Sequence, residues 1–164
     1  MAILVKNFKS NISGIVPLFL LLFISLNGMS IIDLNFFSVN IHFILVYYFV
    51  LRKPDLLGNG FIFLSGIISD VIFGLPLGTS PLSLLAIAAV AAYIRTVTVR
   101  ISLINDWISF IPAILIGNFV YFFALYFSEY SIDYFFLFKN SIFTFIFYPI
   151  LWGVFTLLLN LIKN

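Results

Sequence analysis

Long apolar stretches run along the whole chain, and short polar or turn-forming segments separate them. A transmembrane helix needs about 20 mostly apolar residues, with roughly 17 to 25 tolerated. The stretches predict six transmembrane helices, near residues 12–29, 39–51, 56–74, 81–95, 104–127 and 141–162. The second and fourth are short, so we expect them to be tilted little, partly re-entrant or extended by their flanks.

The composition is typical of a protein whose solvent is lipid. Of the 164 residues, 63% are hydrophobic and 9% are charged, with a mean hydropathy of +1.23. A soluble domain carries about 25% charged residues. We interpret the first apolar stretch as an uncleaved span rather than a secretory signal, because no clear cleavage site follows it and further apolar stretches do. The expected fold class is therefore an all-α integral membrane protein, with residues 1–164 as one transmembrane domain.

Basic residues gather in alternate connections between the predicted spans. Of the eight lysines and arginines, all but Lys139 fall on one side of the membrane in this count. By the positive-inside rule, that side and both termini are cytoplasmic. Arg52, Lys53, Arg95 and Arg100 would form a basic rim there, which could contact anionic lipid headgroups or a cytosolic partner. The net charge of +2 is too small and too dispersed for a nucleic-acid interface.

Asp70 is an acid inside the third predicted span. An aspartate at the centre of a transmembrane helix costs about 2.5–3.5 kcal/mol on insertion, so its carboxylate needs partners. Backbone N–H groups of the turn at residues 74–81 are the expected donors, or the hydroxyls of Thr79 and Ser80, because non-helical backbone at membrane depth must be satisfied internally. Contact with a partner protein or a cation is the alternative.

The turn after Asp70 contains several residues that favour tight backbone geometry. Gly74 and Gly78 permit positive φ, and Pro76 fixes a turn or extended conformation. Ser80 resembles a helix N-cap, with Pro81 at the first helical position. The segment therefore predicts a compact hairpin between the third and fourth spans, closed by the acid.

Two further features suggest helix–helix contacts. Ala88 and Ala92, widened by Ala89, form a small-xxx-small pattern that lets another helix approach closely, either within the fold or from a partner. Asn118 lies about 16 Å along its predicted span from the interfacial Trp107. Its amide would hydrogen-bond a neighbouring helix or contact a ligand.

The side chains that catalysis requires are sparse. There is no cysteine, and His42 is the single histidine. No G-x-S-x-G motif, glycine-rich phosphate loop or second intramembrane acid was identified. We therefore expect no enzyme activity, no bound metal and no cofactor.

Residues 47–85, YYFVLRKPDLLGNGFIFLSGIISDVIFGLPLGTSPLSLL, resemble the central block of the MreD family, the rod-shape-determining membrane proteins of bacteria. That family has an aromatic second span, an R-[RK]-P loop and a third span of the type G-L-L-x-D-x-L-x-G-x-P-L-G. The corresponding positions here are Arg52, Lys53, Pro54, Gly66, Asp70, Gly74, Pro76, Leu77 and Gly78.

The resemblance implies a non-enzymatic role in cell-wall elongation at the bacterial inner membrane. The implied partners are MreC, the actin-like MreB filament, RodA and its penicillin-binding transpeptidase. It also implies a six-helix fold similar to the substrate-binding subunits of energy-coupling-factor vitamin transporters. A solute-binding subunit of that kind is the alternative function. A closed polar cavity in the outer leaflet would favour transport, and a filled interior would favour a scaffold.

Overall fold

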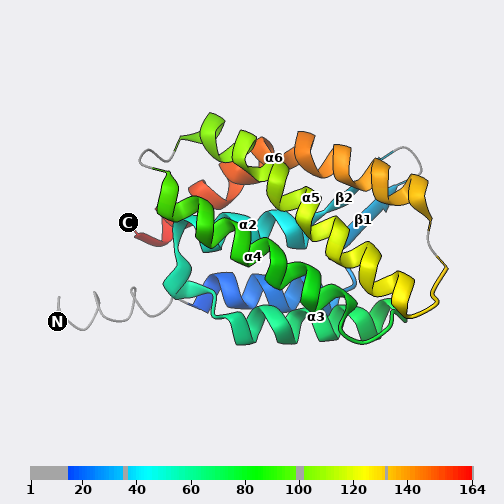
Figure 1. Ribbon diagram of the computed structural model, residues 1–164. Helices are drawn as coiled ribbons and strands as arrows, with labels where there is room; N and C mark the ends of the chain where they lie inside the picture. Colours follow the sequence, from blue (N-terminus) through cyan, green and yellow to red (C-terminus); the bar gives the residue numbers. More distant parts are fainter. Residues whose placement is uncertain (1–14, 35–36, 99–101, 132, 164) are drawn as a thin grey trace.

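The computed structural model describes residues 15–34, 37–98, 102–131 and 133–163 (Figure 1). These ranges contain six α-helices, close to the six predicted spans, so the predicted all-α helical architecture is confirmed. Their bounds are Ile15–Leu26, α2 (Ile41–Arg52), α3 (Asn59–Phe73), α4 (Thr79–Val97), α5 (Leu103–Phe127) and α6 (Tyr134–Lys163). A short 3₁₀ helix, η1 (Pro54–Leu56), connects α2 to α3.

Three of these helices are long and apolar enough to cross a membrane. They are α4, α5 and most of α6, and α6 begins earlier than the sequence predicted. The helix Ile15–Leu26, α2 and α3 are shorter apolar helices. The short second span was expected from the sequence, but the fourth, expected to be short, has 19 residues.

A β-hairpin precedes α2, which the sequence analysis did not predict. Strands β1 (Ile31–Leu34) and β2 (Phe37–Asn40) pair antiparallel, with Ile31 opposite Asn40. The predicted second span, residues 39–51, is therefore extended at its start by strand β2 rather than by more helix. Asn40 ends β2 and also caps α2, because its side chain accepts a hydrogen bond from the Phe43 N–H at 3.1 Å.

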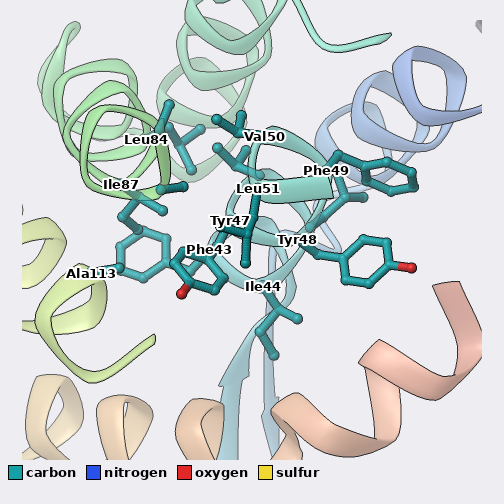
Figure 2. Close-up of a cluster of buried hydrophobic side chains, with 14 of the residues drawn as sticks. Phe43, Ile44, Tyr47, Tyr48, Phe49, Val50, Leu51, Leu84, Ile87 and Ala113 are labelled. Atoms are coloured by element: carbon teal, nitrogen blue, oxygen red, sulfur yellow. The ribbon is translucent and has the colours of Figure 1, made fainter. Parts of the chain in front are cut away.

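Helix α2 forms the centre of the molecule. Every residue from His42 to Leu51 is buried, as expected of a helix that is apolar on all sides. It contacts α4, α5 and α6, and Figure 2 shows Leu84, Ile87 and Ala113 in one cluster with the α2 side chains. The aromatic run YYF at residues 47–49 therefore fills the core rather than facing lipid.

Helices α4 and α5 cross at very short distance. A Cβ added to Gly117 would lie 2.7 Å from Cδ1 of Ile87, and the Ser83 hydroxyl donates to the Gly117 carbonyl at 2.8 Å. Ala88 is buried, whereas Ala92 and Ala89 are exposed. The predicted pair of Ala88 and Ala92 is thus divided between the interior and the outer face of α4.

The connections between elements lie at two opposite ends of the helices (Figure 1). The α2–α3 and α4–α5 connections and the end of α6 are at one end. The β1–β2 hairpin, the α3–α4 turn and the α5–α6 connection are at the other. We refer below to the first end as the basic end and to the second as the hairpin end.

Candidate functional site

Asp70 closes the turn between α3 and α4. Its side chain is 0% exposed. Oδ2 accepts a hydrogen bond from the Gly78 N–H at 2.7 Å, and Oδ1 accepts one from the Ser80 N–H at 2.9 Å. The carboxylate thus satisfies backbone donors at the start of α4, where a helix N-terminus favours negative charge. The expected backbone partners are confirmed.

The glycines of the turn adopt the backbone angles that the sequence predicted. Gly74 ends α3 at φ +63° and Gly78 precedes α4 at φ +104°. The predictions that Ser80 is the N-cap and that Pro81 is the first helical residue were wrong, because α4 begins at Thr79 and its N-cap is Gly78. Asp70, which comes from another helix, supplies the oxygens that an N-cap side chain usually provides.

Gly66 and Pro81 are in direct contact and bring α3 against α4. A Cβ added to Gly66 would lie 2.5 Å from the Pro81 nitrogen and 2.6 Å from its Cα. Two motif residues in the turn, Gly74 and Leu77, are exposed, and 71% of the Leu77 surface is accessible. We call Gly66, Asp70, Gly74, Gly78 and Pro81 together the Asp70 clamp.

A small cavity with a mixed polar and apolar lining lies beside the Asp70 clamp. Its volume is about 20 Å³, and its lining includes Ser30, Asn40, His42, Ser69, Ser80 and Tyr121. The Ser69 hydroxyl is buried and has no hydrogen-bond partner among the described residues, whereas His42 Nε2 lies 3.0 Å from the Ser25 hydroxyl. A cavity of this size accommodates about one water molecule.

Hydrogen bonds between buried polar groups attach the hairpin to α6. The Asn40 N–H donates to the Thr144 hydroxyl at 2.8 Å, that hydroxyl donates to Asn140 Oδ1, and Asn140 Nδ2 donates to Ser38 at 2.8 Å. A second cavity of about 10 Å³ adjoins Asn40 and Asn140. These polar side chains therefore hold the strands in place.

Asn118 connects α5 to α6. Its Nδ2 donates to the Ser141 hydroxyl at 2.7 Å, and that hydroxyl donates to the Leu137 carbonyl. The predicted hydrogen bond to a neighbouring helix is confirmed. Trp107, expected as an interfacial anchor, stacks on Phe145 with ring centroids 5.1 Å apart.

A second buried acid, Asp106, was missed by the sequence analysis. It is 2% exposed in the first turn of α5. Its Oδ2 accepts hydrogen bonds from Arg52 Nη2 at 2.8 Å, Arg52 Nε at 3.2 Å and Trp152 Nε1 at 3.1 Å. The Arg52 guanidinium also lies 4.9 Å from the centre of the Trp152 ring. The ion pair joins α2, α5 and α6 at the basic end.

The Arg52–Asp106 pair gives Arg52 a structural role beyond topology and headgroup contact. Only 21% of the Arg52 side chain is exposed. Lys53 and Arg95 remain exposed, and Pro54 begins η1. Arg100 lies outside the described residues. The signal for Asp106 in the sequence is an acid close to the start of a long apolar stretch, at residues 104–127.

The described residues contain no group of three or more histidine, cysteine, aspartate or glutamate side chains that could hold a metal ion. The two buried acids lie at opposite ends of the molecule, one in the α3–α4 turn and one at the start of α5. Each has its hydrogen-bond donors within the fold.

No family model matches the chain, and neither a curated protein nor a solved structure is detectably similar to it. The resemblance to the MreD family therefore depends on the motif residues themselves. The likeness to transporter subunits depends on that resemblance alone.

Proposed function

We propose that the chain is a non-enzymatic scaffold of the cell-wall elongation machinery in a bacterial inner membrane. In this role it spans the membrane six times with both termini in the cytoplasm. It binds MreC and neighbouring wall synthases, namely RodA and its penicillin-binding transpeptidase, and its basic end faces MreB.

The observation that carries the proposal is that the two buried carboxylates serve the fold itself. Both carboxylates of the interior, Asp70 and Asp106, accept hydrogen bonds from within the chain. The cavities beside Asp70 and Asn140 at the hairpin end measure about 20 and 10 Å³, whereas a site for a drug-sized molecule occupies about 300–1,000 Å³. Such an interior supports a scaffold that binds partners on its outer faces.

The motif residues support the family assignment in a second way. Gly66, Asp70, Gly74, Gly78 and Pro81 are spread over 16 positions and belong to one structural unit in space. A motif that encodes a rigid turn, rather than a set of reactive side chains, fits a family without catalytic residues. The exposed Leu77 at its tip is available for contact with a partner.

Two of the surfaces predicted for partners remain free in the folded chain. Ala92 and Ala89 lie on the exposed face of α4, where small side chains let a partner helix approach closely. Lys53 and Arg95 are exposed at the basic end. Figure 1 places the α2–α3 and α4–α5 connections at the same end as the end of α6, which supports the topology inferred from charge.

Purification from native membranes tests the proposal. The tagged full chain is extracted in a mild detergent, and the proteins that accompany it are identified by mass spectrometry. We expect MreC and the wall synthases, and we expect depletion of the protein to change cell width and the motion of wall synthesis. Unchanged width and motion on depletion would count against the scaffold.

A matched pair of variants locates the partner face. Ala92→Trp adds bulk to the small-residue face of α4, and Ile116→Trp adds an aromatic ring at another exposed position on α5. We expect the first to lower recovery of MreC and the second to leave it unchanged.

The alternative is a solute-binding subunit of an energy-coupling-factor-type vitamin transporter. The polar lining of the cavity beside Asp70, including the unpartnered Ser69 hydroxyl, favours it. Recovery of an ATPase pair with its coupling subunit in the same purification would replace the scaffold with this function.

A further inference from the structure

The connection between α5 and α6 forms an open pocket at the hairpin end. Its volume is about 560 Å³, and it is lined by Tyr126, Phe127, Glu129, Tyr130 and Tyr134. Four aromatic rings therefore surround one carboxylate. Aromatic faces attract cations, and a carboxylate accepts hydrogen bonds from an ammonium group.

The Glu129 carboxylate is available to a ligand. Its side chain has no hydrogen bond or ion pair within the part of the chain that the structure describes. The neighbouring acid, Asp133, instead caps α6 by accepting a hydrogen bond from the Phe136 N–H at 3.0 Å. Lys139, a nearby base on α6, pairs with Asp33 at 3.1 Å. The Glu129 carboxylate thus favours a cationic group in the pocket.

The backbone holds Glu129 in an unusual conformation. Its φ is +54°, in the left-handed region, at the position after a helix end that glycine usually occupies. The Tyr130 N–H closes the helix end by donating to the Leu125 carbonyl at 3.2 Å. The backbone conformation at this position favours glycine, yet the residue here is a glutamate.

A separate, mainly apolar groove lies between α5 and α6. It has a volume of about 370 Å³, and its lining includes Ile111, Leu115, Phe138, Ile142 and Phe145. The shape and chemistry of this groove suit an acyl chain.

The pocket and the groove lie on one face of the α5–α6 pair. Tyr126 follows Leu115 by about three helical turns, and Tyr134 precedes Phe138 by about one turn, so each pair shares a helix face. The Phe122 ring packs beside the pocket, since its centroid lies 6.3 Å from that of Tyr126 and 5.8 Å from that of Tyr134.

We propose that this face binds a phospholipid with a primary ammonium headgroup, such as phosphatidylethanolamine. The ammonium lies among the tyrosine rings and donates to Glu129, the tyrosine hydroxyls donate to the phosphate, and an acyl chain follows the groove. The pocket stands at the helix ends, where a headgroup lies, and the groove stands at the depth of the hydrocarbon. This inference depends on a membrane environment and not on the identity of any protein partner.

Lipid competition tests the proposal. The purified full chain is exchanged into mixed micelles with equal amounts of phosphatidylethanolamine and phosphatidylglycerol, and the retained lipids are counted by native mass spectrometry. We expect phosphatidylethanolamine to be preferred, and Glu129→Gln to lower the preference about two- to fivefold, the range for one exposed ion pair. Asp133→Asn is the matched control, because asparagine also caps a helix, and it should leave the preference unchanged.

A separate substitution tests whether the groove holds the acyl chain. Leu115→Trp fills it and should reduce total lipid retention while the headgroup preference of the remaining lipid is kept. Size-exclusion profiles establish that each variant is folded. Equal retention of both lipids by the wild type, or equal loss of preference in Glu129→Gln and Asp133→Asn, would overturn the proposal. Loss of a co-purifying protein in Glu129→Gln with an unchanged lipid preference would also overturn it, because the pocket would then bind a protein cation.

Discussion

Asp70 and Asp106 are both buried carboxylates at the ends of helices, yet they are satisfied in opposite ways. Asp70 accepts hydrogen bonds from backbone N–H groups that lie eight and ten residues further along the chain. Asp106 accepts them from the side chains of Arg52 and Trp152, which lie 54 and 46 residues away. The first acid closes a local turn, and the second fastens three helices together.

The difference teaches which kind of substitution each acid tolerates. The donors of Asp70 belong to the backbone, so every substitution except proline keeps them. Any side chain without two acceptor oxygens leaves an N–H group unsatisfied there. The donors to Asp106 are side chains. The negative charge of Asp106 and the positive charge of Arg52 can therefore be removed together by a double substitution.

The largest effect is expected for Asp70→Leu. It leaves the N–H groups of Gly78 and Ser80 without acceptors in a buried site, at about 1–3 kcal/mol each, so we expect a loss of about 4 kcal/mol. The measurement is the thermal midpoint of the folded monomer in detergent, together with its abundance in membranes.

Asp70→Asn tests whether both carboxylate oxygens are needed. Both carboxylate oxygens of Asp70 accept hydrogen bonds. An amide offers one acceptor and directs its NH₂ group at a backbone donor. We therefore expect an intermediate loss of about 2 kcal/mol. Normal stability of both variants, with partner binding lost, would instead identify Asp70 as an interface residue.

The next effect is expected for Asp106→Leu, at about 3 kcal/mol, because Arg52 loses the partner that compensates its partly buried charge. The double variant Asp106→Leu/Arg52→Leu should recover most of that stability. A thermal-shift double-mutant cycle measures the recovery. If the double variant were as unstable as the single one, the ion pair would not be the reason for the loss.

A smaller effect, about 2 kcal/mol, is expected for Gly66→Ala, because the new methyl group would overlap the Pro81 backbone and force α3 away from α4. Gly60→Ala in the same helix is the matched control, since an added Cβ there meets nothing within 4 Å. It should be neutral or slightly stabilising, because alanine favours helix. Equal thermal midpoints of the two variants would contradict the close α3–α4 contact.

The smallest effect is expected for Arg52→Lys, at about 1 kcal/mol. Lysine keeps the charge but loses the fork that places Nε and Nη2 on one carboxylate oxygen and stacks on Trp152. The thermal midpoint in low salt and in high salt provides the test. A loss as large as that of Asp106→Leu would mean that geometry, rather than charge, dominates the pair.

The same contrast explains what could be predicted from sequence. The helices follow from apolar stretches, and the Asp70 turn follows from Gly74, Gly78 and an acid a few positions before them, because all of its partners are local. Ser80 was assigned wrongly, since the acceptor at the start of α4 comes from α3. The hairpin was missed because Ile31–Leu34 and Phe37–Asn40 are short and gain their stability from distant residues such as Thr144 and Asn140. The Arg52–Asp106 pair was missed because its two residues lie 54 positions apart in the chain.

The burial of α2 from His42 to Leu51 has a consequence for biosynthesis. The ribosome makes α2 among the first elements, but the helices that surround it include α6, which ends about 110 residues later. At about 5–20 residues per second, this delay lasts on the order of 5–20 s. During that interval the end of β2 lacks its α6 partners Thr144 and Asn140, and Tyr48 lacks Thr156. Until α6 is made, lipid or another helix has to cover the side of α2 that later packs against it. A chain that stops before α6 would therefore have a core that is open on that side.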